Sequence, residues 1–104
     1  MSVDFSDVEI YPSFLTFNVS SSANVATEVI LPSRAKLVQV GCESGALFLS
    51  HTGTDNVALS TTNRGFIPTN NMLQFRLGTG THRLSTLFIA GQSGSEKVVV
   101  IVEE

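Results

Sequence analysis

The chain has few charged residues for its size. Only 14% of its 104 residues are Asp, Glu, Lys or Arg, against roughly 25% in an average soluble domain. The formal net charge is −3, and the sequence has no basic stripe of the kind that neutralises phosphates. Ser and Thr supply the polar surface instead. We therefore expect no direct contact with nucleic acid.

Paired cysteines, an export signal and a membrane span are also lacking. The single Cys42 cannot form an internal disulfide, which argues against a disulfide-stapled secreted domain. Met1 to Phe5 shows no basic segment followed by an apolar stretch. The longest aliphatic run, Val98–Val102, is far shorter than the roughly 20 residues that cross a bilayer. These absences predict a protein that stays in, or is assembled in, a cytoplasm and does not enter a membrane.

The residues that are abundant predict a protein made of β-strands. Short segments rich in β-branched and aromatic residues recur about every ten residues, with Gly, Pro, Asn and Ser between them. Apolar residues do not recur at intervals of three and four, so no long helix is expected. Residues 84–90 are apolar on both faces, which predicts a covered strand. The predicted strands are residues 8–19, 25–31, 36–42, 46–51, 57–60, 72–77, 84–90 and 97–103.

These strands fit one all-β domain over residues 1–104, an antiparallel β-sandwich of about eight strands. The connections are too short for helical crossovers, so antiparallel pairing is expected. A jelly roll is the first choice of topology, and a partly closed β-barrel is the alternative. Residues 43–45, 78–80 and 91–95 are predicted to be hairpin turns. The two glycine-rich turns among them precede strand-like sequence, not the helix that a phosphate-binding loop requires.

No set of side chains has the spacing of a catalytic or metal site. Ser50, His51 and Asp55 bring a hydroxyl, an imidazole and a carboxylate within six residues. Adjacent strand residues point to opposite faces, however, so Ser50 and His51 are poorly placed to share a hydrogen bond. His51 and His82 form no HxH or HxxxH pair, and three converging metal ligands are lacking. We expect no enzyme activity, no metal and no cofactor.

Two apolar segments are candidates for contact with other subunits. Val98–Val102 is unbroken, whereas a strand with one solvent-exposed face would alternate. Either this strand lies at the centre of a sheet, beneath residues 8–19, or one of its faces packs against another subunit. The second apolar segment, residues 8–19, is dense in aromatic residues for a core of this size. Residues 1–7, which precede it, are predicted to form a flexible N-terminal arm. The predicted interface residues are Tyr11, Phe14, Phe17, Val98, Val100 and Val102.

Three stretches carry a resemblance to a known class of protein: Ile30–Ala35, Val40–Ser50 and Val98–Glu104. Through them, residues 25–104 resemble the small β-structured virion proteins of tailed bacteriophages, especially capsid decoration or cement proteins. The resemblance implies a virion protein, assembled in the host cytoplasm, that binds the outside of the capsid as a dimer or trimer. It would bridge major capsid subunits. Such a protein can be held firmly on the capsid although each contact is modest, because the lattice repeats the contact many times.

A receptor-binding module associated with a phage tail or fibre is the alternative function, and an enzyme is the third. Sugar-binding modules usually stack their ligands on exposed aromatic rings. The chain has no Trp, and Tyr11 is its single Tyr. Co-purification with particles, glycan binding and substrate turnover would separate the three classes.

Overall fold

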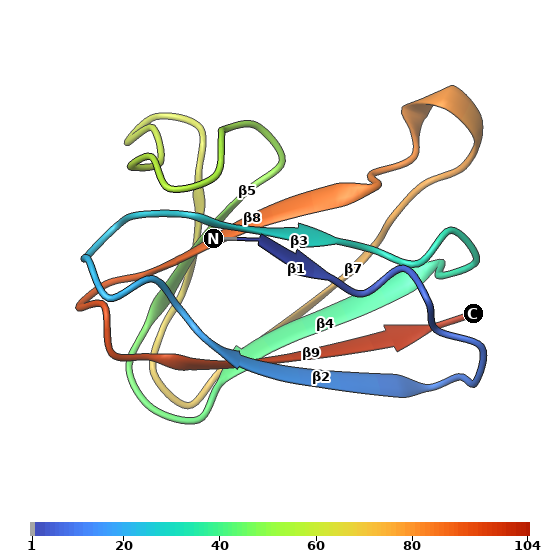
Figure 1. The fold of residues 1–104 in the computed structure, drawn as a ribbon, viewed down its shortest axis with the longest axis horizontal. Coiled ribbons are helices and arrows are strands. Elements are labelled where there is room, and N and C mark those ends of the chain that lie inside the picture. Colours follow the sequence, from blue (N-terminus) through green and yellow to red (C-terminus); the bar gives the residue numbers. More distant parts are fainter. Residues whose placement is uncertain (1) are drawn as a thin grey trace.

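Two β-sheets packed face to face make up residues 2–104 in the computed structural model (Figure 1). One sheet has five strands in the order β1-β3-β8-β5-β6, and the other has four in the order β2-β9-β4-β7. The sheets do not close into a barrel, so the predicted all-β sandwich is confirmed over its barrel alternative. The strands are β1 Ser2–Asp4, β2 Ser13–Asn18, β3 Thr27–Ile30, β4 Leu37–Cys42, β5 Leu47–Ser50, β6 Gly65–Ile67, β7 Met72–Arg76, β8 Thr86–Gly91 and β9 Lys97–Glu103, with a 3₁₀ turn, η1, at Gly80–His82.

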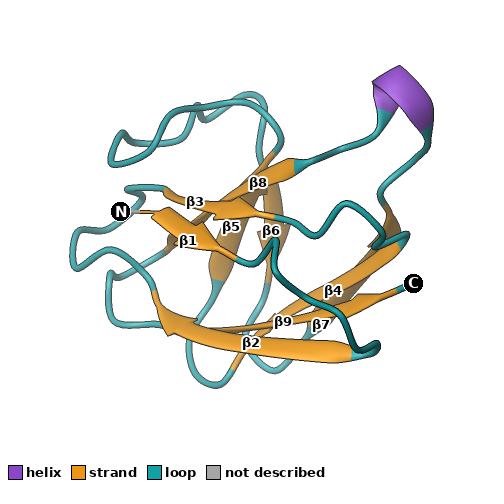
Figure 2. Ribbon diagram, turned by 45° about the vertical axis from the view of Figure 1, so that its right-hand side comes forward, coloured by secondary structure: helices purple, strands orange, loops and turns teal. Residues whose placement is uncertain are grey.

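The order of strands β2 to β9 is that of a jelly roll. β2 lies beside β9 and β3 lies beside β8, so the two ends of the chain pair with each other. This arrangement wraps two Greek keys into one sandwich. Every strand pair is antiparallel except β1 with β3. Only the connection from β5 to β6 stays within one sheet, and the others cross between the two layers seen in Figure 2.

Several local predictions are wrong, and three of them fail because of these crossings. Residues 43–45, 78–80 and 91–95 are not hairpin turns, since each joins strands that belong to different sheets. Turn residues show that the chain reverses, but they do not show which sheet the next strand enters. Residues 57–60 form one bridge, between Val25 and Ala58, in place of the predicted strand. β6, at Gly65–Ile67, lies between the predicted strands 57–60 and 72–77, where no strand was predicted.

The central strand β9 explains the unbroken apolar run. Val98, Val100 and Val102 are completely buried in the core, while Val99 and Ile101 face the other side of the sheet. β2 and β4 pair with β9 on its two edges. The central-strand interpretation is therefore correct, and the three buried valines cannot contact another subunit. The same core holds the inward residues of both sheets, among them Val29, Val38, Val40, Leu47, Ile67, Leu87 and Ile89.

The N-terminal segment belongs to the fold, contrary to the expected flexible arm at residues 1–7. Met1 lies outside the described residues. Ser2–Asp4 pairs in parallel with β3, and the Phe5 amide donates to the Ile30 carbonyl at 2.9 Å. Phe5 is 7% exposed and packs in the core. A three-residue strand is too short to show a period, which is why the sequence pattern did not reveal it.

The outer faces of the two sheets differ. The long connection from β5 to β6 covers the middle of the five-stranded sheet, where Leu59 packs with Ala26 and Phe88, while Phe66 on the edge strand β6 stays 51% exposed. Two hydrogen bonds attach this loop, from the Ala26 amide to the Val57 carbonyl and from the Leu59 amide to the Asn24 carbonyl. β8 is therefore covered on both faces, as the sequence predicted. The four-stranded sheet carries large exposed apolar side chains on its outer face.

Candidate functional site

The outer face of the four-stranded sheet is the first candidate surface. Phe14 lies opposite Ile101, and Thr16 lies opposite Val99, so all four side chains point away from the core. Phe14 is 65% exposed and Met72 is 47% exposed. We call this surface the bare face; it consists of Phe14, Thr16, Leu37, Gln39, Met72, Val99 and Ile101.

Gly41 helps to keep the bare face flat. It lies opposite Met72 in the β4–β7 pair. A Cβ atom at Gly41 would come within 2.9 Å of the Met72 Cε atom. The missing side chain therefore lets Met72 lie across the sheet and extend the apolar surface from β9 toward β7.

The predicted interface residues fall on both sides of the sheet. Tyr11 and Phe17 are half-buried and pack against the core, whereas Phe14 points outward. The outward residues of β9 are Val99 and Ile101, not the valines that were predicted. The uniform run of β9 has no polar residue to mark its outer side, so the sequence alone could not separate the two sets.

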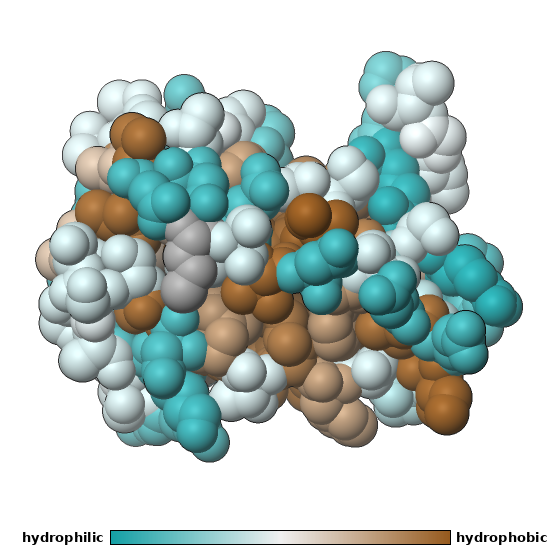
Figure 3. Space-filling view, viewed as in Figure 1, coloured by the Kyte–Doolittle hydropathy of each residue, from teal (hydrophilic) through white to brown (hydrophobic). Residues whose placement is uncertain are grey.

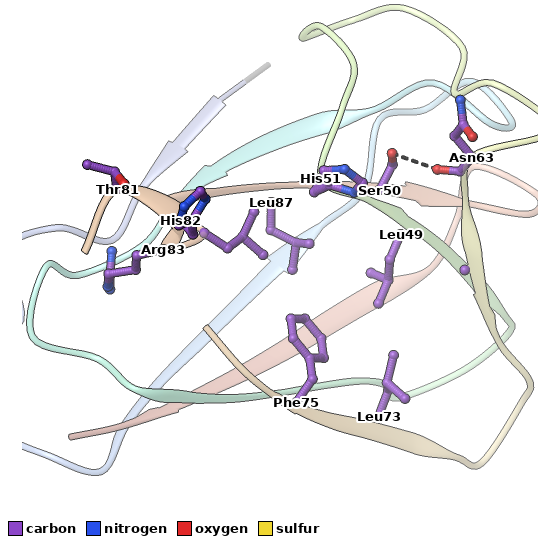
Figure 4. Close-up of a pocket in the computed structure, with 12 residues that line it drawn as sticks. Leu49, Ser50, His51, Asn63, Leu73, Phe75, Thr81, His82, Arg83 and Leu87 are labelled. Carbon is purple, nitrogen blue, oxygen red and sulfur yellow. Dashed lines mark hydrogen bonds between the residues drawn. The ribbon is translucent and has the colours of Figure 1, made fainter. Parts of the chain in front are cut away.

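A cleft is the second candidate site. It opens between the sheets on the flank where β6 and β7 form the edges, and its volume is about 530 Å³. Leu49 and Leu87 point from the five-stranded sheet toward Leu73 and Phe75 on β7 (Figure 4). The lining side chains with polar atoms come from β5 and the two connections beside it: Ser50, His51, Asn63, Thr81, His82 and Arg83.

Two of the polar side chains around the cleft, Ser50 and Arg83, make structural hydrogen bonds. The Ser50 hydroxyl donates to the Asn63 carbonyl at 2.9 Å and accepts from the Thr52 amide at 3.1 Å. Ser50 therefore anchors the loop after β5 and is not bonded to His51. The Arg83 guanidinium donates to the carbonyls of Pro32 and Ala35, the second at 3.0 Å, and ties the β7–β8 connection to the β3–β4 connection. Within residues 2–104, no three His, Cys, Asp or Glu side chains are placed to hold a metal ion.

Glu96 is a buried carboxylate that the sequence analysis missed. It is 2% exposed. Its oxygens accept hydrogen bonds from the amides of residues 93–95 at 2.8 to 3.0 Å and from the Ser93 hydroxyl at 2.8 Å. Burial acts to raise the pKa of Glu96, but the hydrogen bonds from Ser93 and Gly94 outweigh it and hold the pKa below its usual range.

The role of Glu96 is to stabilise the turn between β8 and β9. Gly94 has a φ of +91°, and a Cβ there would come within 2.6 Å of the Ser21 carbonyl oxygen. A Cβ on Gly91 would overlap the Glu96 carboxylate. The carboxylate and the glycines therefore form one closely packed unit with no space for a ligand. The clue in the sequence was a carboxylate directly after a Gly/Ser turn whose amides need an acceptor.

Comparison of the chain with protein-family models, with curated proteins and with solved structures found no match. None of the helical structure in residues 2–104 is long and apolar enough to cross a membrane. The bare face and the cleft are thus the features on which a functional proposal can be built.

Proposed function

We propose that the chain is a virion structural protein of the capsid decoration or cement type. It binds the capsid lattice, bridges major capsid subunits as a homo-oligomer, and is incorporated into the virion in the host cytoplasm. The bare face is the observation that supports this proposal. A contiguous apolar surface on the outer face of a sheet is typical of a protein interaction site.

The bare face suits binding through many modest contacts. Burying the exposed part of Phe14 would contribute about 1–2 kcal/mol to the binding free energy. Its neighbours Val99 and Ile101 are half-buried, and burying their remaining exposed surface would add to this contribution. One such contact is weak. A repeated lattice presents it many times, and an oligomer that engages several sites at once gains from their high effective concentration.

The low charge of the chain points to the same mode of attachment. Phe14, Met72 and the apolar residues between them carry no charge, so their contact with a lattice would depend little on salt. Charged residues occur only toward the ends of the outer strand faces, at Arg76, Lys97 and Glu103. Specificity would then come from the shape of the apolar surface and from polar groups at its rim.

The test is to mix the purified chain with capsids assembled from the major capsid protein of the same genome and to measure co-sedimentation. Phe14→Asp should weaken binding by at least about tenfold, because it places a charge in an apolar contact. Phe66→Asp is the matched control, since Phe66 is 51% exposed on the other sheet. The proposal is wrong if the parent chain does not sediment with capsids, or if the two variants lose binding equally.

A receptor-binding module on a phage tail or fibre is the second candidate, and the cleft favours it. Its apolar floor, polar rim and volume of about 530 Å³ are of the kind that holds a small ligand. Glycan-array binding that is lost on His82→Ala, without association with capsids, would support this function over the first.

A further inference from the structure

The two flanks of the sandwich differ in charge. The first 33 residues contain no Lys or Arg but include the carboxylates Asp4, Asp7, Glu9 and Glu28. Residues 56–95 show the opposite pattern: they contain no Asp or Glu, and their charged residues are Arg64, Arg76 and Arg83. β1 and β2 border one flank and β6 and β7 border the other, so the acidic and the basic segments lie on opposite sides of the molecule.

The acidic flank carries an apolar side chain that the fold does not use. Phe5, Val8 and Tyr11 pack inward as the chain crosses from β1 to β2. Ile10 points out of the same segment and is 81% exposed, and its neighbour Glu9 is exposed as well. Figure 3 shows this side of the molecule, where apolar surface between β1 and β2 is interspersed with hydrophilic side chains.

The basic flank carries a hollow of matching character. Its cleft has an apolar floor that includes Leu73 and Phe75, and Arg83 contributes to the lining. None of the described residues that line the cleft is Asp or Glu. An aliphatic side chain flanked by carboxylates therefore complements this flank in both shape and charge.

We propose that copies of this chain bind one another head to tail, with Ile10 of one copy in the β6–β7 cleft of the next. Asp7 and Glu9 would then face Arg83, the arginine that lines the cleft, across the contact. Such a contact joins two different surfaces and repeats from copy to copy. Because the two flanks lie on opposite sides of the sandwich, two copies cannot satisfy both contacts, so the contact leads to a ring of three or more or to an open chain.

This contact uses the flanks and leaves the bare face free, so it stands independently of the proposed function. The first measurement is sedimentation velocity on the purified full chain from about 1 to about 500 µM. The chain should associate as its concentration rises. Raising the salt from about 0.05 to about 0.5 M should weaken the association several-fold, because the charged groups at the rim are screened. A chain that stays monomeric throughout would overturn the proposal.

Two variants each disable one side of the contact. Ile10→Asp removes the apolar side chain, and Leu73→Glu places a carboxylate in the cleft, where Leu73 is 41% exposed. Each should weaken self-association by at least about tenfold. His82→Glu tests the cleft side at an exposed lining position and should weaken it too. Val57→Asp is the matched control, because Val57 is 55% exposed in the loop that covers the other sheet.

A mixture of the two disabled variants gives the decisive result. Chains with Leu73→Glu keep Ile10, and chains with Ile10→Asp keep the cleft, so one productive contact remains between them. An equimolar mixture should therefore form a 1:1 complex that grows no further, although each variant alone is monomeric. A mixture that stays monomeric, or an Ile10→Asp variant that associates like the parent, would show that another surface mediates association.

Discussion

The flank between β1 and β2 is closed by the chain's own N-terminal segment, whereas the flank between β6 and β7 is open. On the closed flank, Phe5, Val8 and Tyr11 fill the space between the sheets. On the open flank the corresponding space is the cleft, with Leu73 and Phe75 at its floor. A jelly roll has two such flanks, and this chain extends only its N-terminus over one of them. The difference shows that the core is complete on one side and accessible on the other.

The largest effect is expected when the closed flank is opened. Phe5→Ala should destabilise the domain by about 3 kcal/mol, because it removes a large buried side chain and leaves a cavity. The melting temperature should then fall by more than about 12 °C, as measured by differential scanning calorimetry. Leu73→Ala, which shortens a 41% exposed side chain in the cleft of the open flank, is the matched control and should cost clearly less. Equal losses would show that the two flanks do not differ in packing.

A smaller effect is expected at Glu96, which lies on neither flank. Glu96→Gln should cost about 2 kcal/mol at neutral pH, because a buried charged acceptor of several hydrogen bonds is lost. The folded-state pKa of Glu96 is lowered, so its contribution is present above the carboxyl's ordinary pKa and disappears as the pH falls through the lower folded value.

Urea unfolding of the parent and of Glu96→Gln across the acidic range gives the measurement. The stability of the parent should fall more steeply toward low pH than that of the variant. Phe5→Ala, in contrast, should lower stability by the same amount at each pH. Parallel pH profiles for the parent and Glu96→Gln would mean that the turn does not depend on the charged carboxylate.

The comparison of flanks also shows where sequence reasoning succeeds. Alternation in β4 and β7 and the unbroken apolar run in β9 placed these strands within about a residue or two of their observed ends. Pairing was out of reach, because β2 with β9 and β3 with β8 join segments that are distant in the chain. The turns looked like hairpins for the same reason: their residues are local, whereas the choice of sheet is set by distant strands.

The candidate surfaces were harder to predict than the strands. Phe14 was identified as an interface residue because an aromatic cluster stood out, and the structure leaves it exposed. Val99 and Ile101 were missed, since an uninterrupted apolar strand does not reveal which of its faces is inner. The cleft arises where β6 meets β7 across the sandwich, and no spacing in the sequence reports such a meeting.

The smallest effect, a difference in amide hydrogen exchange, tests the open flank without changing any residue. No strand of residues 2–104 pairs with the outer edge of β7. The Leu77 amide donates to the Lys36 carbonyl at 2.9 Å, and hydrogen-bonded pairs alternate along an antiparallel ladder. With the observed register, the Phe75 amide therefore bonds to the Val38 carbonyl, while the amide of Gln74 points into the open flank.

In the dilute chain, the Gln74 amide should exchange at least about tenfold faster than the Phe75 amide, and the Phe5 amide on the closed flank should be protected. NMR-detected exchange resolves these amides one by one. Equal protection of Gln74 and Phe75 in dilute solution would show that the edge of β7 is already covered, and would remove the distinction between the two flanks.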